Sequence, residues 1–399
     1  MLLLRFPLVL PEEQNMLTIL SKSGIITVLA IAVWHICITE MKNKTAVAEK
    51  EKTMLQEKTS SAGEKVSQAI LIILCCLIGL VLIVLLAARA YFRISVREYY
   101  ANSKKAFVIP GLSDGMIHQG LAYDSENDTF LITGYRSDGK ASQLSMVSKS
   151  DGKEIKRLDL AKEDGSIFTG HVGGITLHKN YIYIANGKGL IIFDRNDILA
   201  ASDGDSVKAI GIFKTTSDDD SLGVAFTHVE KDMIYVGEFY REANYKTPDS
   251  HKYKTAAGDE NTALIIAYRL DDTAPFGISE KIERAYSAPA LVQGMCFDGE
   301  GNIYLSTSYA VAFSHIYAYD PTKQEGSITV LGQTVPLYVL DSSTQTADIK
   351  IAPMSEEIVI LDGKLYVMCE SATNKYIFGK FTSAKYCYAT DLSKYRQGE

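Results

Sequence analysis

The chain of 399 residues has few cysteines for its length, and this scarcity excludes a disulfide-stabilised scaffold. Three lie in apolar runs, where they are expected to act as small hydrophobic residues, and three lie in the C-terminal region: Cys37, Cys75 and Cys76, then Cys296, Cys369 and Cys387. A Cys369–Cys387 bridge is conceivable because both residues fall on predicted strands. We favour buried free thiols.

Two further features are missing. The net charge is −7, so the chain offers no global electrostatic case for binding nucleic acid. It contains no Gly-rich phosphate loop, no nucleophile elbow and no His-Glu metalloprotease motif. The acidic run at residues 217–221 lacks the spacing of a helical calcium loop. No motif-defined enzyme class is therefore indicated.

One long hydrophobic run is present. Ile70–Ala88 reads ILIILCCLIGLVLIVLLAA, without a charged residue. About 20 apolar residues span the hydrocarbon core of a bilayer, which is about 30 Å thick. We predict a transmembrane helix over 66–92, with Tyr91 and Phe92 as interfacial anchors, and a juxtamembrane linker over 93–104. We expect a retained anchor because no clear cleavage site follows the run.

The segment 1–65 carries a shorter apolar run, 24–39, and then a Lys/Glu-rich stretch. Three interpretations fit the apolar run: a second span, a signal-like segment, or sequence upstream of a true start at Met41. Six Lys precede the long run from Met41 on, against five Lys and Arg after it up to Lys105. This difference barely discriminates between the two orientations, but the Lys/Glu-rich stretch slightly favours a cytoplasmic N-terminal segment, which places the C-terminal region outside the cytoplasm.

The region 105–399 is repetitive. Five segments share one pattern, in which an apolar strand, a turn with Asp, Gly or Asn, and a strand rich in Ile, Tyr and Val follow each other. Their anchor positions are Gly120, Gly174, Gly223, Gly294 and Glu357. The repeat length, roughly 50–70 residues, is typical of the four-stranded blades of a β-propeller. A polar insertion at 241–261 explains the longest interval.

Third strands follow each pair, and fourth strands are predicted in four units, with SITVLGQT as the fourth strand of unit four. The last unit lacks one, and Lys105–Leu112 could supply it by closing the ring. We therefore predict an all-β propeller behind an N-terminal transmembrane helix. Five blades are visible, and six are possible because 335–353 holds more strand than one fourth strand needs. A β-sandwich is the alternative, but it predicts no regular repeat.

The start of the first strand and the end of the second strand of an antiparallel pair lie together, so both ends share one rim of the channel. The candidate binding residues on this rim are His118, Gln119, His171, Asn186, Glu238, Gln293, Glu356, Glu357 and Glu370, with Lys375 and Tyr376 in the loop beyond. Because strand residues alternate between faces, Glu356 and Glu357 are not both expected to point into the channel. Glu357 stands where the other four units have glycine.

The blade rhythm resembles NHL-like and strictosidine-synthase-like propellers and, more loosely, the senescence-marker and gluconolactonase family. In the latter, the resemblance implies a metal held by Glu and Asn around the channel, with Glu before Gly at a strand start. Here the matching pairs are Gln119-Gly120 and Gln293-Gly294, and only Glu356 keeps the acid. Independently of this pattern, the oxygen atoms of the rim residues suit a hard cation such as Ca²⁺, and the candidate metal ligands are Glu356 and Glu370.

Three hypotheses follow for the rim. It binds a cell-surface ligand, such as a carbohydrate, peptide or protein partner, which is the function we favour. It performs metal-assisted hydrolysis of the lactonase type. Or its polar residues only satisfy the ends of the strands. His171 in TGHVGG suits a general base, but a lone His beside two glycines is more often a turn residue.

Overall fold

The computed structural model describes residues 35, 38–44, 62–376, 378–382 and 384–395, and it divides into two compact units, Met1–Leu80 and Val81–Glu399. In the first unit, residues 38–44 are helical and helix α3 (Ala62–Ile94) begins. The ambiguous run 24–39 lies almost wholly outside the described residues. Residues Ser67–Ile94 of α3 form a helix long and apolar enough to cross a membrane.

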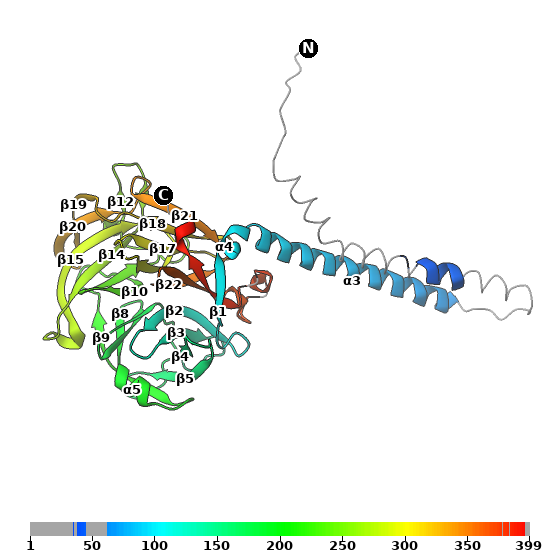
Figure 1. The fold of residues 1–399 in the computed structure, drawn as a ribbon, viewed down its shortest axis with the longest axis horizontal. Helices are drawn as coiled ribbons and strands as arrows, with labels where there is room; N and C mark the ends of the chain where they lie inside the picture. Colours follow the sequence, from blue (N-terminus) through cyan, green and yellow to red (C-terminus); the bar gives the residue numbers. More distant parts are fainter. Residues whose placement is uncertain (1–34, 36–37, 45–61, 377, 383, 396–399) are drawn as a thin grey trace, which may run out of the picture. The chain divides into compact units, whose positions relative to one another are not determined.

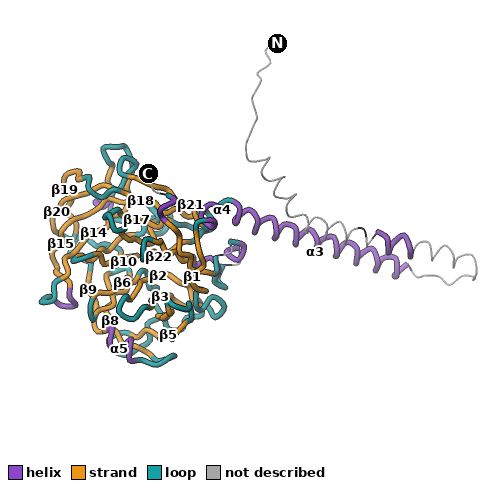
Figure 2. Tube along the Cα trace, viewed as in Figure 1, coloured by secondary structure: helices purple, strands orange, loops and turns teal. Residues whose placement is uncertain are grey.

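The second unit is a β-propeller, as predicted (Figures 1 and 2). Within the described residues it has five four-stranded blades. Blade one consists of β2 (Met116–Asp124), β3 (Thr129–Arg136), β4 (Gln143–Ser148) and β5 (Glu154–Ala161). Blade two consists of β6 (Ile175–His178), β7 (Tyr181–Asn186), β8 (Gly189–Asp194) and β9 (Ser206–Lys214), with helix α5 (Arg195–Ala200) between the last two strands.

The other blades follow the same order from the channel outward. Blade three consists of β10 (Val224–Glu230), β11 (Met233–Glu238), β14 (Ala263–Leu270) and β15 (Ile278–Ala288). Blade four consists of β16 (Val292–Phe297), β17 (Ile303–Thr307), β18 (Ser314–Tyr319) and β21 (Gln345–Ile351). Blade five consists of β22 (Ser355–Leu361), β23 (Lys364–Cys369), β24 (Tyr386–Asp391) and β1 (Ser103–Val108).

Strand β1 confirms the predicted closure, because it pairs antiparallel with β24 and completes the last blade from the other end of the chain. The innermost strands contact each other in ring order, with β22 touching both β2 and β16. Figure 1 shows β2, β10 and β22 in the middle of the propeller, with β5, β15 and β20 toward its periphery. Hydrophobic clusters fill the spaces between adjacent blades.

The prediction for the fourth blade is wrong in one strand. SITVLGQT covers the end of β19 (Gln324–Val330), a two-residue turn and the start of β20 (Gln333–Val339). These two strands form a hairpin, and β20 pairs in parallel with β15 of blade three. The fourth strand is β21 instead. The surplus strand that suggested a sixth blade is therefore this inserted hairpin, which extends a neighbouring sheet.

The burial patterns differ between the outer and the inner strands, and each pattern follows from the local sequence. In β9 every second residue is buried, as expected for a strand with one face in solvent. Most of β22 and β23 is buried, which is typical of strands covered on both faces. The turn between them, Leu361–Lys364, has positive φ at Asp362 (52°) and Gly363 (69°), the geometry of a tight two-residue hairpin turn.

The remaining elements are short and lie outside the four-stranded blades. They are α4 (Arg97–Ala101), β12 (Tyr253–Lys254) paired with β13 (Glu260–Asn261), and five 3₁₀ turns: η1 (Asp249–His251), η2 (Pro275–Gly277), η3 (Glu370–Ala372), η4 (Phe378–Phe381) and η5 (Leu392–Lys394). Cys296, Cys369 and Cys387 are free and buried, as favoured from the sequence. The predicted linker 93–104 contains the end of α3, all of α4 and the start of β1.

Glu357 lies inside the channel, where inner strands of several blades meet on its carboxylate. The carboxylate accepts hydrogen bonds from the backbone N–H groups of Leu121 in β2 (3.0 Å), Ile175 in β6 (2.6 Å) and Thr227 in β10 (3.4 Å). The side chain comes from blade five, so one residue links four blades. On blade four, a Cβ at Gly294 would lie 2.5 Å from the Glu357 Cα, so only glycine fits there.

These contacts correct two predictions. Glu357 is 1% exposed and is not a rim residue. The donor in blade three is Thr227, so the residue equivalent to Gly120 and Gly174 is Phe226 and not Gly223. The sequence match was shifted by three residues. Both Glu356 and Glu357 reach the channel because β22 has a bulge between Ser355 and Ile358, which breaks the alternation of faces.

We predict that Glu357→Gln lowers the free energy of unfolding by about 2–4 kcal/mol, because hydrogen bonds to a charged acceptor are replaced and the new amide N–H₂ faces backbone donors. Urea unfolding of the purified full chain in detergent, followed by circular dichroism, measures this loss. Glu356→Gln is the matched control, one residue earlier and without backbone donors, and should change stability by less than about 1 kcal/mol. Equal losses in the two variants would contradict the structural role of Glu357.

Candidate functional site

A cavity of about 1100 Å³ lies at one end of the channel. Seven of the nine predicted binding residues line it, and together they come from all five blades: Gln119, His171, Asn186, Glu238, Gln293, Glu356 and Glu370. The two others lie elsewhere. Glu357 is inside the channel, and His118 is fully buried with its Nε2 hydrogen-bonded to the Pro110 carbonyl. Burial lowers the pKa of His118 to about 4, as expected for a neutral core histidine.

Glu356 lines the cavity with a carboxyl group that is not satisfied by protein. The residue is 2% exposed. Among the described residues, its carboxyl has no hydrogen-bond or ion-pair partner. Burial raises its pKa well above the ordinary value, and the negative charges of Glu370 and Glu357 raise it further. Glu356 is therefore a buried acid that faces an open space.

Glu370, the neighbour of Glu356, begins the turn η3 directly after β23. Its carboxylate accepts hydrogen bonds from Gln119 Nε2 (3.1 Å) and from the Tyr376 hydroxyl. Burial raises the pKa of Glu370 to about 7, although these donors and the Lys375 ammonium act in the opposite direction. Two acids with raised pKa values share one cavity, so the pair holds at least one proton at neutral pH.

The loop after Glu370 brings a cation and an aromatic ring to this pair. Lys375 Nζ donates to the Tyr135 hydroxyl (2.6 Å) and lies 5.0 Å from the Tyr135 ring centroid and 5.1 Å from that of Tyr376. Asn374 Nδ2 donates to the Ser113 carbonyl (2.7 Å). The sequence placed Lys375 and Tyr376 in this loop but assigned them no function.

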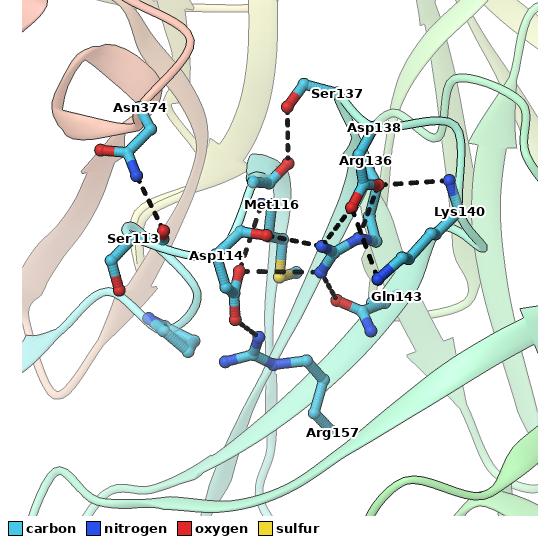
Figure 3. A network of polar contacts seen from close by, with 12 residues as sticks. Ser113, Asp114, Met116, Arg136, Ser137, Asp138, Lys140, Gln143, Arg157 and Asn374 are labelled. Atoms are coloured by element: carbon cyan, nitrogen blue, oxygen red, sulfur yellow. Dashed lines mark hydrogen bonds and ion pairs between the residues drawn. The ribbon is translucent and has the colours of Figure 1, made fainter.

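Figure 3 shows how the Asn374 contact is supported. Asp114, next to Ser113, forms ion pairs with Arg136 and Arg157 of blade one, and Arg136 also pairs with Asp138 (2.7 Å). This network fixes the connection between β1 and β2 to blade one. The loop that carries Lys375 is consequently held from two sides, through Asn374 and through Tyr135.

His171 and Asn186 form the wall of blade two. The Asn186 amide donates to the His171 carbonyl (2.6 Å), and the His171 ring lies 4.6 Å from the Tyr135 ring. His171 is exposed to the cavity, yet protein surrounds the cavity on most sides. This environment, and then the charge of Lys375, lowers the pKa of His171 to about 4. The ring is therefore neutral at pH 7 and can both donate and accept hydrogen bonds.

Glu238 lines the cavity on the side of blade three, but both of its carboxylate oxygens already have protein partners. One accepts from the Leu264 backbone N–H (3.0 Å), and the other lies 2.9 Å from His251 Nδ1. Asp220 lies on the other side of the His251 ring, 3.0 Å from Nε2. Burial lowers the pKa of His251, but the two carboxylates outweigh it and raise the pKa above its usual value. No sequence pattern pointed to His251, which lies in the polar insertion.

The residues present do not fit a calcium site. Ca²⁺ takes about six to eight oxygen ligands. The groups that face Glu370 are a hydroxyl donor, an amide N–H₂ group and an ammonium group, and Glu238 is committed to His251 and Leu264. No group of three or more His, Cys, Asp or Glu side chains that could hold a metal ion occurs in the described part of the chain.

Aromatic side chains stand near the cavity mouth. Tyr245 and Tyr309 are exposed and line the cavity. The Tyr245 ring packs edge-on against Phe239 with centroids 5.4 Å apart, and the Arg241 guanidinium lies 4.0 Å from the Tyr309 ring centroid. The cavity therefore has an acidic, hydrogen-bonding interior and aromatic rings toward its opening.

No protein-family model and no curated protein match the sequence. Solved structures that are similar include one from a nidogen/laminin complex (10% identity, TM-score 0.34, covering 64% of this chain and 73% of that one). A PQQ-bound aldose sugar dehydrogenase from Streptomyces coelicolor (12%, 0.38, 72% and 95%) and a glutaminyl cyclase from Myxococcus xanthus (10%, 0.37, 72% and 94%) are others. These values assign the chain to no particular propeller family.

The raised pKa of Glu370 predicts a pH-dependent stability. Its folded-state value of about 7 lies above the ordinary value of 4.5. The stability contribution is therefore complete below about pH 4.5 and lost as the pH rises through 7. Relative to Glu370→Gln, the wild type should lose up to about 3 kcal/mol of unfolding free energy between pH 4.5 and 8.

Urea unfolding of both proteins across this pH range measures the difference. Asp362→Asn, which removes an exposed carboxylate at the far end of the same hairpin, is the control and should run parallel to the wild type. If the free energy of unfolding of Glu370→Gln changed with pH in parallel with that of the wild type, Glu370 would not be a buried acid.

Proposed function

We propose that the chain is a membrane-anchored propeller, placed outside the cytoplasm, whose cavity binds a neutral, hydroxyl-rich ligand of the carbohydrate class. The observation that carries this proposal is Glu356. It is a buried carboxyl without a protein partner at the edge of a cavity of about 1100 Å³. A ligand hydroxyl can donate to this carboxyl or accept from it, and no group among the described residues competes for it.

The other cavity groups support the same ligand class. Gln293, Asn186, Ser221 and Ser308 offer amide and hydroxyl groups that donate and accept hydrogen bonds. Tyr245 and Tyr309 offer exposed rings on which the C–H face of a sugar ring can pack. A few polar groups that fix orientation, combined with aromatic surface, are typical of small-molecule sites.

Lys375 favours a neutral ligand over a cationic one. Its ammonium group already lies over the Tyr135 and Tyr376 rings, where a ligand cation would otherwise make cation–π contacts. It also acts on the acid pair, because its charge lowers the pKa of both Glu356 and Glu370. A second cation would meet its repulsion.

The anchor rests on α3 and on charge. Ser67–Ile94 has 28 residues, which at about 1.5 Å each exceeds the hydrocarbon core of about 30 Å. The Lys-rich stretch that precedes it supports a cytoplasmic N-terminal segment.

A second function, hydrolysis of a bound sugar, is supported by one observation. The pKa of Glu370 lies near 7, where a carboxyl group is suited to acid–base catalysis, and a second carboxyl stands beside it. Release of reducing ends from a bound oligosaccharide distinguishes catalysis from binding alone.

The ligand class is tested by titrating the full chain, in nanodiscs free of sugar detergent, with chitobiose, cellobiose, tri-alanine and choline in a calorimeter. We expect a neutral disaccharide to bind and Glu356→Gln to weaken binding about 3- to 10-fold, since a hydrogen bond between uncharged groups contributes about 0.5–1.5 kcal/mol. Asp362→Asn should bind normally. Binding of tri-alanine or choline alone, or equal binding by Glu356→Gln, would contradict the proposal.

The orientation is tested with engineered thiols in intact cells that express the chain. A membrane-impermeant maleimide should label Asp362→Cys, in the propeller, well above the background of the wild type. It should label Lys44→Cys, before the helix, only after the membrane is permeabilised. The reverse pattern would place the propeller in the cytoplasm.

A further inference from the structure

The loop 308–313, which joins β17 and β18, contacts two functional regions. At its start, Ser308, Tyr309 and Ala310 line the cavity. In its middle, Tyr309 is 40% exposed and Val311 is 46% exposed. At its end, Phe313 packs against the last turns of α3. Tyr309 is covered on one face by the Arg241 guanidinium and belongs to the cavity, so Val311 is the exposed apolar side chain of the loop that lies two residues from Phe313.

The contact with α3 is an aromatic cluster. The Phe313 ring centroid lies 5.7 Å from that of Tyr91 and 5.7 Å from that of Phe92, and the two helix rings are 5.5 Å apart. Tyr91 and Phe92 are the residues expected at the boundary between bilayer and water. Phe313 therefore stands at the level of this boundary.

The position of Phe313 relative to the hydrocarbon core follows from helix geometry. Tyr91 and Phe92 are three and four residues beyond Ala88, where the apolar run ends. At about 1.5 Å per residue they lie roughly 5–6 Å past the hydrocarbon core. The headgroup region on each side of a bilayer is roughly 5–8 Å thick. Phe313, which touches both rings, falls within it, and Val311 is only two residues away.

The propeller has little freedom to move off this level. After α3, Val96, Tyr99 and Tyr100 are buried in the hydrophobic cluster of blades four and five. The Arg93 guanidinium packs 3.5 Å from the Tyr100 ring centroid. The helix end is thus built into the propeller core, and loop 308–313 is held beside it.

The charges at this level match an anionic lipid surface. Lys350 Nζ lies 4.3 Å from the Phe313 ring centroid, and Arg241 lies over Tyr309. Arg89 and Arg93 lie in the last turns of α3, and Arg97 begins α4. Basic residues near a membrane surface bind anionic headgroups, while an exposed apolar side chain such as Val311 enters the interfacial layer.

We propose that loop 308–313 is a second membrane-contact site, which inserts Val311 into the headgroup layer of an anionic bilayer, while Tyr309 stays on the cavity side of the loop. This inference rests on the membrane anchoring proposed above and not on the identity of the sugar. One wall of the cavity is then held at the membrane surface.

The test uses the full chain with Trp34→Phe, so that an introduced tryptophan is the only one. Val311→Trp is reconstituted in nanodiscs of phosphatidylcholine and phosphatidylglycerol, and lipids brominated on their acyl chains near the headgroup quench its fluorescence. We expect quenching at least threefold stronger than for Ile212→Trp. This control is equally exposed (49%) but lies on the outer strand β9 of blade two, across the ring from blades four and five.

Two further variants complete the test. Leu82→Trp, in the apolar run, reports anchoring itself. If Leu82→Trp is quenched and Val311→Trp is quenched no more than Ile212→Trp, the contact proposed here is overturned while the anchor stands. If Leu82→Trp is not quenched, the anchor fails and the inference with it. Lys350→Glu should reduce the quenching of Val311→Trp in phosphatidylglycerol discs, and an unchanged value would overturn the anionic preference.

Discussion

Hydrogen bonds from three backbone N–H groups to the Glu357 carboxylate connect inner strands that are far apart in the sequence. A propeller has no single core; its blades pack pairwise, and the channel is where their polar strand edges converge. A carboxylate offers about four acceptor sites on two oxygens, twice as many as a hydroxyl or an amide oxygen, so it can satisfy all three donors. Burial raises the pKa of Glu357, and the three donors oppose that rise by stabilising the charge.

The strand that carries Glu357 also gives the cavity its chemistry. Glu356 precedes Glu357 on the bulged strand and faces the open side, so the cavity ends in an acid that the scaffold does not satisfy. Glu370, Gln119, Tyr376 and Lys375 surround it with donors and one compensating cation. A third acid, Glu238, is hydrogen-bonded to His251 and to the Leu264 backbone N–H, so it forms part of the cavity wall and has no oxygen left for a ligand. The acids in this region thus have different environments and different functions.

Blade five concentrates these features because it is where the chain closes. Strand β1, arriving from the helical anchor, completes the blade whose inner strand carries Glu356 and Glu357. The end of α3 packs against blade four beside the same cavity. Disruption of closure would therefore affect the anchor, the channel and the site together.

The sequence by itself determined the apolar span, the blade rhythm, the ring closure by the segment before the first blade, and most of the cavity residues. Each of these follows from a local period or from the antiparallel pairing of neighbouring strands. A bulge and an inserted hairpin leave no periodic signal. Tertiary structure alone therefore decided the five-blade count, the position of Phe226 and the burial of His118. It also decided that Glu357 is structural while Glu356 faces the cavity. The hydrogen-bond donors that distinguish these two acids come from residues more than a hundred positions away, and only the closed ring brings them together.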